Sequence, residues 1–514
     1  MDLPVSVAVL QSFGDTTPMA ILKALFLTTL LAYVVYMRHF HPLSQYPGPL
    51  FASLSNTYKA YHVYKLTIHE KLLELHNTYG PIVRIGPNHL HTWEGDAIAP
   101  IYKGGRSMGK SEFYDAFTAF RPNLFGGRDE DTHALRRRQL SHGFAQVSVQ
   151  QLEPLIEGQM AILISKLHHY AQTGEAFDLK HALSLYVLDI LGEVAFAKPF
   201  CVQHTEDDEK LHAISDHLLL AGVIGELPCQ KLTKFLSRIS PVPWMRRLMK
   251  SRNTLKGICA GCVRFKIENL ESTRSRPDLL RGLVEATDPE SGKRLSEEEI
   301  NSEAFAVLVA GSHSTAGTLT LLFWHLVQNP SIVRKVQAEI ESTLGPLNKD
   351  QVSYPIAGLE SSLKYTMACV RENFRVNPVF TMPLWRRVGY PGGLEIAGHH
   401  IPHGTNICIS NYVLHHNPSI FGSDHCIYNP EKWLDESYNK EKGRYLIPFS
   451  VGHRMCIGRN LAMTNILKSV CTLVMLFEFE PLEKRNDVRV VSPGIGEMGG
   501  VFEVRVRARG ASRG

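Results

Sequence analysis

The sequence predicts a mainly α-helical protein with a small β-rich subdomain, placed behind an N-terminal membrane helix. Three observations support this fold class. Apolar residues recur at helical spacing over long stretches that are separated by proline or glycine. Segments with strand character are few and short. Near the start, an apolar run of about 19 residues has the length needed to cross a bilayer.

The apolar run covers residues 19–37 and contains one charged residue, Lys23, whose long side chain can reach the interface. A cleaved signal peptide is the alternative, but no small-residue cleavage site follows the run. The next residues, from Arg38 to His41, are rich in basic side chains, which favour the cytoplasmic side. We therefore expect an uncleaved anchor, with the short N-terminal segment 1–18 across the membrane.

A proline-rich hinge is expected after the anchor, over residues 38–49. Three prolines in this stretch, Pro42, Pro47 and Pro49, preclude a helix and stiffen the link. The remaining residues, 50–514, show no repeat or low-complexity tract and are expected to form one domain that faces the cytosol.

Within this domain the sequence predicts strands at two places and helices over most of the rest. The strand signals are residues 81–86 and a strand-and-turn stretch over 394–405. The helical pattern is clearest in four ranges, which are 151–170, 183–197, 297–328 and 332–343.

Composition excludes several classes of function. The chain is 44% hydrophobic and 20% charged, a normal globular balance. Its net charge is only +5 and the basic residues are spread along the chain, so nucleic-acid binding has no support. Nine cysteines without framework spacing fit a reducing compartment. Cys259 and Cys262 could form a redox pair or half of a zinc site, but they have no second pair, which favours two small residues on a helix.

The most informative segment runs from Phe449 to Gly458 and contains one cysteine, Cys456. A lone cysteine is usually a small buried hydrophobe. Cys456, however, stands just before an apolar helical run over 461–477, where unpaired N–H groups and the helix dipole stabilise a thiolate. A stable thiolate suits a metal.

The neighbours of Cys456 supply what a haem-thiolate site needs. Gly452 and Gly458 lack a Cβ and let the backbone approach a flat macrocycle. Arg454 could clamp a haem propionate by charge-assisted hydrogen bonds. Phe449 could pack beside the sulfur, where apolar cover sets the electronics of the iron. Each residue alone has an ordinary explanation, but all five occur together at fixed spacing.

This segment resembles the haem-binding loop of the cytochrome P450 family, whose pattern F-x-x-G-x-R-x-C-x-G is matched at every fixed position. The resemblance covers nearly all residues after the hinge. It implies the cytochrome P450 fold, with residues 50–514 as a single haem-thiolate catalytic domain. It also implies haem b as cofactor, with the Cys456 thiolate as the axial ligand of the iron.

The resemblance implies further propionate-binding residues. His133 and Arg137 lie four apart on one helical face, which is usually a solvated basic face. In the family, residues at these positions reach the propionates from the side opposite the cysteine loop. Arg387 resembles another propionate-binding arginine, although Arg386 is adjacent and the assignment could shift by one.

Glu372 and Arg375 lie three apart on one predicted helix, an ordinary surface pair if taken alone. They resemble the buried E-x-x-R pair that holds the haem-binding core of the family together, a structural role. The third partner in the family is an arginine, and the matching position here is Lys432. Because lysine cannot make planar bidentate contacts, we expect a looser network or a third contact from elsewhere.

A capping box at Ser296–Glu299 opens the helix predicted over 297–328. Its middle, residues 310–315, combines glycine with Ser and Thr, where a helix can open or pack closely. The family pattern here, [AG]-G-x-[DE]-T-[TS], lies over the oxygen-binding face of the haem. The acid position holds His313 and the hydroxyl position holds Ser314, followed by Thr315.

These three residues are the catalytic candidates. The resemblance implies that Ser314 and Thr315 donate hydrogen bonds on the oxygen side of the haem. A histidine with a pKa near about 6.5 could relay protons in place of the missing acid. Alternatively, His313 is a passive residue on the back of the helix.

Together, these features predict a monooxygenase in the endoplasmic reticulum membrane that inserts one oxygen atom from O2 into a small hydrophobic natural product. The hinge and the helix resemble fungal secondary-metabolism members, so a terpenoid or polyketide-like substrate is expected. Expected pocket walls are the apolar stretches 117–125, 218–227, 305–309 and 379–383.

Electrons are expected from a separate NADPH-cytochrome P450 reductase, because the haem loop ends only 56 residues before the C-terminus (514 − 458). Two alternatives remain open. One is a haem-thiolate isomerase or dehydratase that needs no reductase, and the other is a non-enzymatic haem sensor.

Overall fold

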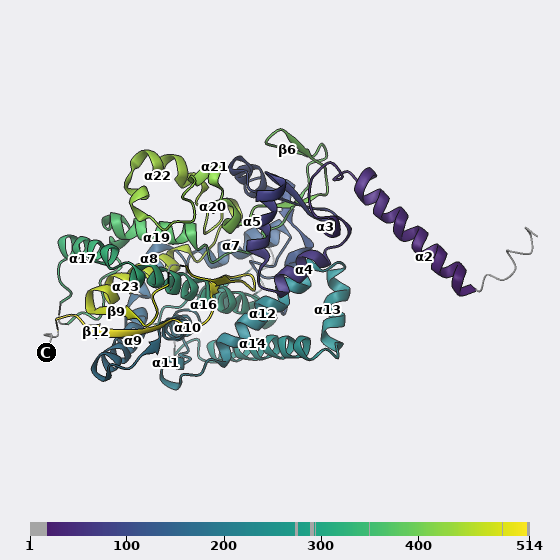
Figure 1. The fold of residues 1–514 in the computed structure, drawn as a ribbon. Helices are drawn as coiled ribbons and strands as arrows, with labels where there is room; N and C mark the ends of the chain where they lie inside the picture. Colours follow the sequence, from purple (N-terminus) through teal and green to yellow (C-terminus); the bar gives the residue numbers. More distant parts are fainter. Residues whose placement is uncertain are drawn as a thin grey trace, which may run out of the picture.

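The computed structural model describes residues 18–272, 276–287, 292, 294–348, 350–485 and 487–510. It begins with helix α2 (Pro18–Val35), which has no buried residue and projects from the body, and continues into the π-helical turn η1 (Tyr36–Phe40) (Figure 1). Residues 18–40 are long and apolar enough to cross a membrane. Apart from Pro18, the predicted segment 1–18 lies outside the described residues. The predicted hinge continues from η1 into turns and extended chain up to Pro49.

Helix α16 (Glu297–Gln328) forms the centre of the body (Figure 1) and confirms the predicted range. Its first turn is closed by the predicted capping box: Ser296 Oγ accepts from Glu299 N–H, and Glu299 Oε2 accepts from Ser296 N–H. This helix is also apolar enough to span a membrane, but 72% of its apolar window is buried. It is therefore a core helix, because its apolar surface is covered by protein.

The remaining long helices surround α16, and the predicted ranges 151–170, 183–197 and 332–343 are confirmed as α9, α10 and α17. Helix α10 begins before the predicted range because Asp178 caps it, accepting a hydrogen bond from Lys180 N–H. The long helices are α5 (Ile68–Tyr79), α7 (Glu130–Ser141), α9 (Glu153–Thr173), α10 (Leu179–Phe196), α12 (Glu209–Glu226), α13 (Gln230–Ile239), α14 (Pro243–Glu268), α17 (Pro330–Leu344), α19 (Lys364–Val376) and α23 (Arg459–Leu476).

Short helices connect these elements. Those of the first half of the chain are α3 (Leu50–Leu54), α4 (Thr57–Tyr64), α6 (Ile98–Tyr102), α8 (Gln146–Gln151), α11 (Val202–Thr205) and the 3-10 segments η2 (Gly95–Ala97), η3 (Gly105–Ser107) and η4 (Glu112–Phe117). Those of the second half are α15 (Arg281–Glu285), α18 (Leu359–Ser362), α20 (Asn411–His415), α21 (Pro418–Phe421), α22 (Glu436–Lys442) and the 3-10 segments η5 (Pro430–Leu434), η6 (Gly443–Tyr445) and η7 (Gly452–Arg454).

The largest sheet has five strands in the order β1 (Ile82–Gly86), β2 (His89–Thr92), β8 (Asn406–Cys408), β5 (Arg386–Val388) and β3 (Met108–Lys110). β2 and β8 are parallel, and the other pairs are antiparallel. The predicted strand at 81–86 is β1. Lys110 pairs directly with Arg386 across β3 and β5, so that the sheet brings these two cations together.

The strand-and-turn stretch predicted over 394–405 forms a separate hairpin of β6 (Leu394–Ile396) and β7 (His399–Ile401). Two further small sheets contain strands that the sequence did not indicate, because several are only two residues long. These strands are β4 (Phe177–Asp178), β9 (Phe477–Pro481) and β12 (Glu503–Ala508) in one sheet, and β10 (Val490–Val491) and β11 (Glu497–Met498) in the other.

The cysteine pair on α14 lies in the core. Cys259 and Cys262 are both buried, and burial raises the pKa of the Cys262 thiol to about 11. Protonated thiols surrounded by apolar side chains are unreactive, which supports the interpretation of two small residues on a helix.

Candidate active site

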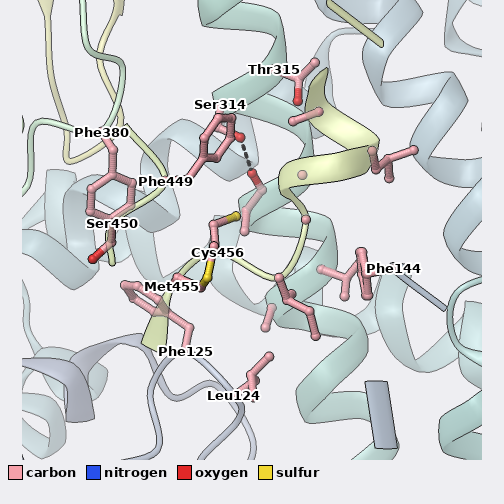
Figure 2. Close-up of a pocket in the computed structure, with 18 of the residues that line it drawn as sticks. Leu124, Phe125, Phe144, Ser314, Thr315, Phe380, Phe449, Ser450, Met455 and Cys456 are labelled. Carbon is pink, nitrogen blue, oxygen red and sulfur yellow. Dashed lines mark hydrogen bonds between the residues drawn. The ribbon is translucent and has the colours of Figure 1, made fainter. Parts of the chain in front are cut away.

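A large cavity separates α16 from the loop that precedes α23. About 1800 Å³ of space, part of it open to solvent, lies between its lining atoms. Cys456 from the loop and Ser314 and Thr315 from α16 line this one space, together with mainly apolar side chains (Figure 2). The two parts of the sequence with the most informative motifs therefore meet in the fold.

Cys456 is held by the turn that begins at Phe449. Its backbone N–H donates to Phe449 O over 2.8 Å, and α23 begins just after Gly458. The side chain is exposed, since its sulfur faces the cavity. Its position inside the fold, away from bulk solvent, raises the pKa of the thiol, while a backbone hydrogen bond at Gly458 and the charge of Arg137 act in the opposite direction. A metal cation at the sulfur would reverse this balance, because coordinated thiols lose their proton.

Arg454 lies beside the cysteine and is already partly engaged. Its Nη2 is 2.8 Å from Glu130 Oε1, and its Nη1 donates to Gly127 O over 3.0 Å. Burial opposes ionisation of Glu130, but its bonds to Arg454 and His453 outweigh burial and lower its pKa. Nη2 itself is buried without a hydrogen bond of good geometry, which leaves a donor for another anion.

Five basic side chains line the cavity, and several of them affect one another's pKa. Burial, followed by the charges of Arg386 and Arg454, holds the pKa of Lys110 well below its usual range. Burial, followed by Arg454 and Lys110, lowers the pKa of His133 to about 3, so that this ring is neutral. The five are Lys110, His133, Arg137, Arg386 and Arg454.

This arrangement fits the acidic groups of a haem. In the lysine and the three arginines of this set, Lys110, Arg137, Arg386 and Arg454, burial disfavours the charged form unless anions compensate it. Among the described residues, Glu303 is the one carboxylate that lines the cavity, and Glu130 pairs with Arg454 beside it. Two propionates would supply the missing negative charge. The thiol and the excess of basic side chains over carboxylates on the cavity wall therefore both suit a haem, whose acidic edge would meet the basic residues.

His133 and Arg137 both reach the cavity from α7. Arg137 Nη1 donates to Met455 O over 2.7 Å, and the buried His133 ring lies edge-on to His453 at 6.0 Å between centroids. His133 and Arg137 therefore do not form the solvated basic face that their spacing also allowed.

Arg387 does not reach the cavity and requires a correction. Its side chain is 53% exposed and pairs with Glu112 at 3.4 Å. Arg386, its neighbour in β5, is buried and lines the cavity instead, donating to Tyr114 Oη over 2.9 Å. Successive side chains in a strand point to opposite faces of the sheet. A shift of one residue therefore decides which of the two arginines lines the cavity and which is exposed.

The two glycines of the motif serve different purposes. Gly458 lines the cavity, and a Cβ there would lie 3.9 Å from Cys456 Sγ. Gly452 is absent from the cavity wall; its φ is +78°, and a Cβ would lie 2.4 Å from Tyr102 O. Its freedom is needed for the turn and for packing on Tyr102, rather than for approach to a macrocycle. Phe449 lines the cavity, with its ring edge-on to Phe374 at 5.4 Å.

Helix α16 is continuous through residues 310–315, and the opening that the sequence allowed does not occur. Ser314 Oγ donates to Ala310 O over 2.7 Å, a bond within the helix that Figure 2 shows as a dashed line. Thr315 is also on the cavity wall. Both hydroxyls are thus placed to meet a ligand in the cavity.

His313 faces away from Ser314, into a second cavity behind α16. Successive residues of a helix point about 100° apart, which separates these neighbours. His313 Nε2 lies 2.7 Å from Ser215 Oγ, and its Nδ1 is buried without a partner. Burial lowers its pKa, so that the ring is neutral near pH 7. About 880 Å³ of space, part of it open to solvent, lies between the atoms of the second cavity, and Lys180, His181, His212 and Glu497 are among the polar side chains that line it.

Glu372 and Arg375 form a fully buried ion pair on α19, with Arg375 Nη2 2.7 Å from Glu372 Oε1. The third contact is made by Trp433, whose indole N–H donates to Glu372 Oε2 over 2.8 Å. Lys432 pairs instead with Asp424 at 2.6 Å. Trp433 therefore supplies the third contact where the family has an arginine and this chain has Lys432. Of the two outcomes expected from the sequence, this is a third contact from elsewhere.

The apolar walls come from some of the expected stretches. Segments 117–125, 305–309 and 379–383 contribute, whereas none of 218–227 lines the cavity. That segment belongs to α12, which packs on α4, α14 and η4, where Phe113 contacts Gly225 closely. Lining residues that the sequence did not suggest are Leu191, Val194, Leu384 and Ile495. Lys110 was missed as well, because it reaches the cavity through the pairing of β3 with β5, which no local pattern of the sequence indicates.

Comparisons with known proteins agree with this geometry. A family model described as cytochrome P450 matches residues 42–496. The monooxygenase poxM of Penicillium oxalicum is 27% identical over 90% of each chain, and cicH of Emericella nidulans is 28% identical over 96% of this chain and 99% of its own. Benzoate 4-monooxygenase bphA of Aspergillus niger is 26% identical over 91% and 95%, respectively.

Among solved structures, a cytochrome P450 named CYP102L1 superposes with a TM-score of 0.74 at 17% identity, covering 90% of this chain and 99% of that one. This likeness concerns the fold. The resemblance first suggested by the cysteine loop is therefore confirmed over residues 42–496.

Proposed function

The chain belongs to the cytochrome P450 family, and from this premise we propose that it is a monooxygenase that inserts one atom of O2 into a small hydrophobic natural product. The single observation that carries the proposal is the position of Cys456 on the same cavity as Ser314 and Thr315. A substrate that receives the oxygen atom would have to lie in this cavity, between the Cys456 loop and α16.

The family implies a haem-thiolate iron cofactor, which supplies the activation of O2 when bound. In this chain Cys456 Sγ would be the iron ligand. Lys110, Arg137, Arg386 and Arg454 would hold the propionates, with the neutral His133 adding a hydrogen bond. Phe449 and the apolar walls would keep water from the sulfur.

Two sets of side chains around α16 are proposed to handle protons. On the cavity side, Thr315 Oγ1 would donate a hydrogen bond toward the oxygen side of the haem, and Ser314 Oγ would do so when its proton turns away from Ala310 O. Behind the helix, His313 would take up and release a proton at Nδ1, while Ser215 Oγ fixes the ring through Nε2. The neutral ring that burial favours can both accept and release a proton.

The substrate is proposed to be apolar and of natural-product size, of terpenoid or polyketide type, in a fungal secondary-metabolite pathway. The walls supplied by Phe125, Val307, Val379 and Phe380 support this class, since they offer contact area without charge. The three relatives named above are from fungi, and one of them carries the name of a small aromatic acid, benzoate 4-monooxygenase.

Electrons are proposed to come from an NADPH-cytochrome P450 reductase, and the site of action is proposed to be the cytosolic side of the endoplasmic reticulum membrane. The exposed helix α2 supports the membrane location. A haem-thiolate isomerase or dehydratase would turn over without NADPH, and a sensor would not consume oxygen. Turnover with and without NADPH and reductase therefore separates the three classes.

The first test is the carbon monoxide difference spectrum of the reduced protein. We expect the band of a thiolate-ligated haem in the wild type and its loss in Cys456→Ser. A second, buried cysteine on α23, Cys471, gives a matched control, since Cys471→Ser should keep the band. A wild-type spectrum without the thiolate band contradicts the proposal. Comparison of metabolites with and without the protein would then identify the product.

A further inference from the structure

Arg454 differs from the other basic residues of the cavity wall because it has a carboxylate partner. Its Nε donates to Glu130 Oε2 over 3.1 Å, its Nη2 lies 2.8 Å from Glu130 Oε1, and its Nη1 donates to Gly127 O over 3.0 Å. Within the described part of the chain, the lysine and the other two arginines of the wall form no ion pair with a carboxylate. The charge of Arg454 is therefore offset before any acidic group enters the cavity.

Glu130 is placed by the start of α7. It is the first residue of that helix, and Asp129 caps the helix by accepting a hydrogen bond from Thr132 N–H over 2.8 Å. The positive end of the helix dipole stabilises a carboxylate in this first turn. Burial acts to raise the pKa of Glu130, but the bonds to Arg454 and His453 outweigh it and lower the pKa, so that the group is ionised near pH 7.

His453 holds the second side of this carboxylate. Its Nε2 lies 2.9 Å from Glu130 Oε2. The side chain of His453 is 40% exposed, whereas that of Glu130 is 14% and that of Arg454 only 2% exposed. Salt screens such a partly buried pair much less than an exposed one. Glu130 does not line the cavity itself, so that it acts on a bound group through Arg454, which does.

The charges of the wall show what Glu130 contributes. Arg137, Arg386 and Arg454 carry three positive charges, and Glu130 carries one negative charge, which leaves two for the two propionates of a haem (3 − 1 = 2). Burial favours the neutral forms of the remaining groups: the pKa of Lys110 lies well below its usual range, that of His133 is lowered to about 3, and that of Glu303 is raised to about 7. Without the charge of Glu130, one positive charge would be in excess.

We propose that Glu130 is a positioning residue that holds Arg454 at the cavity wall and, by its negative charge, sets the potential at which the haem iron is reduced. This role rests on the haem-thiolate function proposed above. Ferric iron carries one more positive charge than ferrous iron, so that a negative charge nearby favours the ferric form and lowers the potential. Reduction adds one electron, which the proposed reductase supplies, and Glu130 neither gains nor loses a proton.

The test is a spectroelectrochemical titration of the full-length, haem-loaded protein, which measures the midpoint potential of the ferric–ferrous couple. The variant is Glu130→Gln, whose side chain has the same shape and can still accept a hydrogen bond from Arg454. The matched control is Asp131→Asn, which makes the same change of charge at the next residue. Asp131 is 70% exposed and pairs with the exposed Arg106.

We expect the ferrous-to-ferric ratio at a fixed potential to rise about tenfold in Glu130→Gln, which is about 60 mV for one electron, with unchanged haem content. The rise should persist at high salt, because the pair is partly buried. Glu130→Asp keeps the charge but draws the carboxylate back from Arg454 by one methylene, and it should give a smaller rise. Asp131→Asn should leave the potential unchanged.

Two results would overturn the proposal. An unchanged potential in Glu130→Gln would show that Glu130 only joins α7 to the cysteine loop, whatever happens to Tm or haem content. Equal rises in Glu130→Gln and Asp131→Asn would show that the contact with Arg454 has no special effect. If Glu130→Gln does not retain haem, Glu130→Asp takes its place in the titration, and an unchanged potential there has the same meaning. A wild type without the thiolate band would instead contradict the haem-thiolate function itself.

Discussion

Ser215 Oγ lies 2.7 Å from His313 Nε2, on the side of α16 opposite to the cavity that Ser314 lines. Two adjacent residues of one helix thus face two different cavities, one apolar and one polar. The family pattern places an acid at position 313, and this chain joins a histidine to a serine from α12 instead. This arrangement leads to two predictions about protons.

Ser314→Ala should uncouple oxygen consumption from product formation more strongly than His313→Ala. Ser314 faces the reacting space directly, whereas His313 acts from behind the helix. We expect product formation to fall by about 10²-fold, the effect of losing one positioned proton donor, while oxygen consumption continues. The measurement is product formed per O2 consumed. Unchanged coupling in Ser314→Ala would show that the register of the motif is shifted.

Ser215→Ala should lower coupling without changing haem content or substrate-induced spectra. Without its bond to Ser215, the His313 ring is free to turn, and the pH profile of coupling should shift. The matched control is Ser184→Ala, which lies on the same cavity but whose hydroxyl donates to Lys180 O. Identical pH profiles in wild type and Ser215→Ala would argue that His313 is passive.

Arg386→Leu should reduce haem retention, whereas Arg387→Leu should not. Only Arg386 is buried on the cavity wall, and a charged hydrogen bond to a propionate contributes about 1.5–3 kcal/mol. The haem absorbance per polypeptide after gel filtration measures the difference. The neighbouring arginine in the same strand is an internal control, and equal haem loss in both variants would contradict the placement.

Glu372→Gln and Arg375→Leu should both destabilise the protein severely. Each removes one member of an ion pair that is fully buried and leaves an uncompensated charge, at a cost of about 3–5 kcal/mol. Arg507→Leu, from an exposed pair with Glu480, should have no measurable effect. Thermal unfolding of the haem-loaded protein measures all three. If the Tm of Arg375→Leu were within experimental error of wild type, the pair would not have the structural role predicted for it.

Stability should decrease as pH falls from 7 to 5, because several histidines are buried in the neutral form. Burial lowers the pKa of His325 and of His415 to about 3. In the unfolded chain these groups bind protons below about pH 6.5, so that each favours unfolding by about 2 kcal/mol at pH 5. Above pH 7 both states are neutral and this effect disappears.

His415→Gln tests this dependence. His415 Nε2 accepts from Ile447 N–H, a bond that a protonated ring cannot make. The variant should be less stable than wild type at pH 7 but lose less stability on going to pH 5. The slope of Tm against pH is the decisive quantity, and an unchanged slope would mean that His415 does not titrate on unfolding.

The sequence alone determined the features that depend on local pattern. The capping box at Ser296, the apolar period of α16 and the turn around Cys456 are specified by residues close in the chain, so that their elements could be predicted. The haem-binding motif belongs to the same class, because its spacing is carried by one loop and the helix that follows.

Only the tertiary structure decided where side chains point and what they meet. Because side chains alternate along a strand, Arg386 lines the cavity and Arg387 is exposed. Because neighbouring residues of a helix point about 100° apart, Ser314 and His313 face different cavities. Pairing of β3 with β5 brought Lys110 to Arg386, and packing of α12 supplied Ser215 and removed segment 218–227 from the cavity. These relations join residues that are far apart in sequence, and their geometry is fixed by the packing of whole elements rather than by any local pattern.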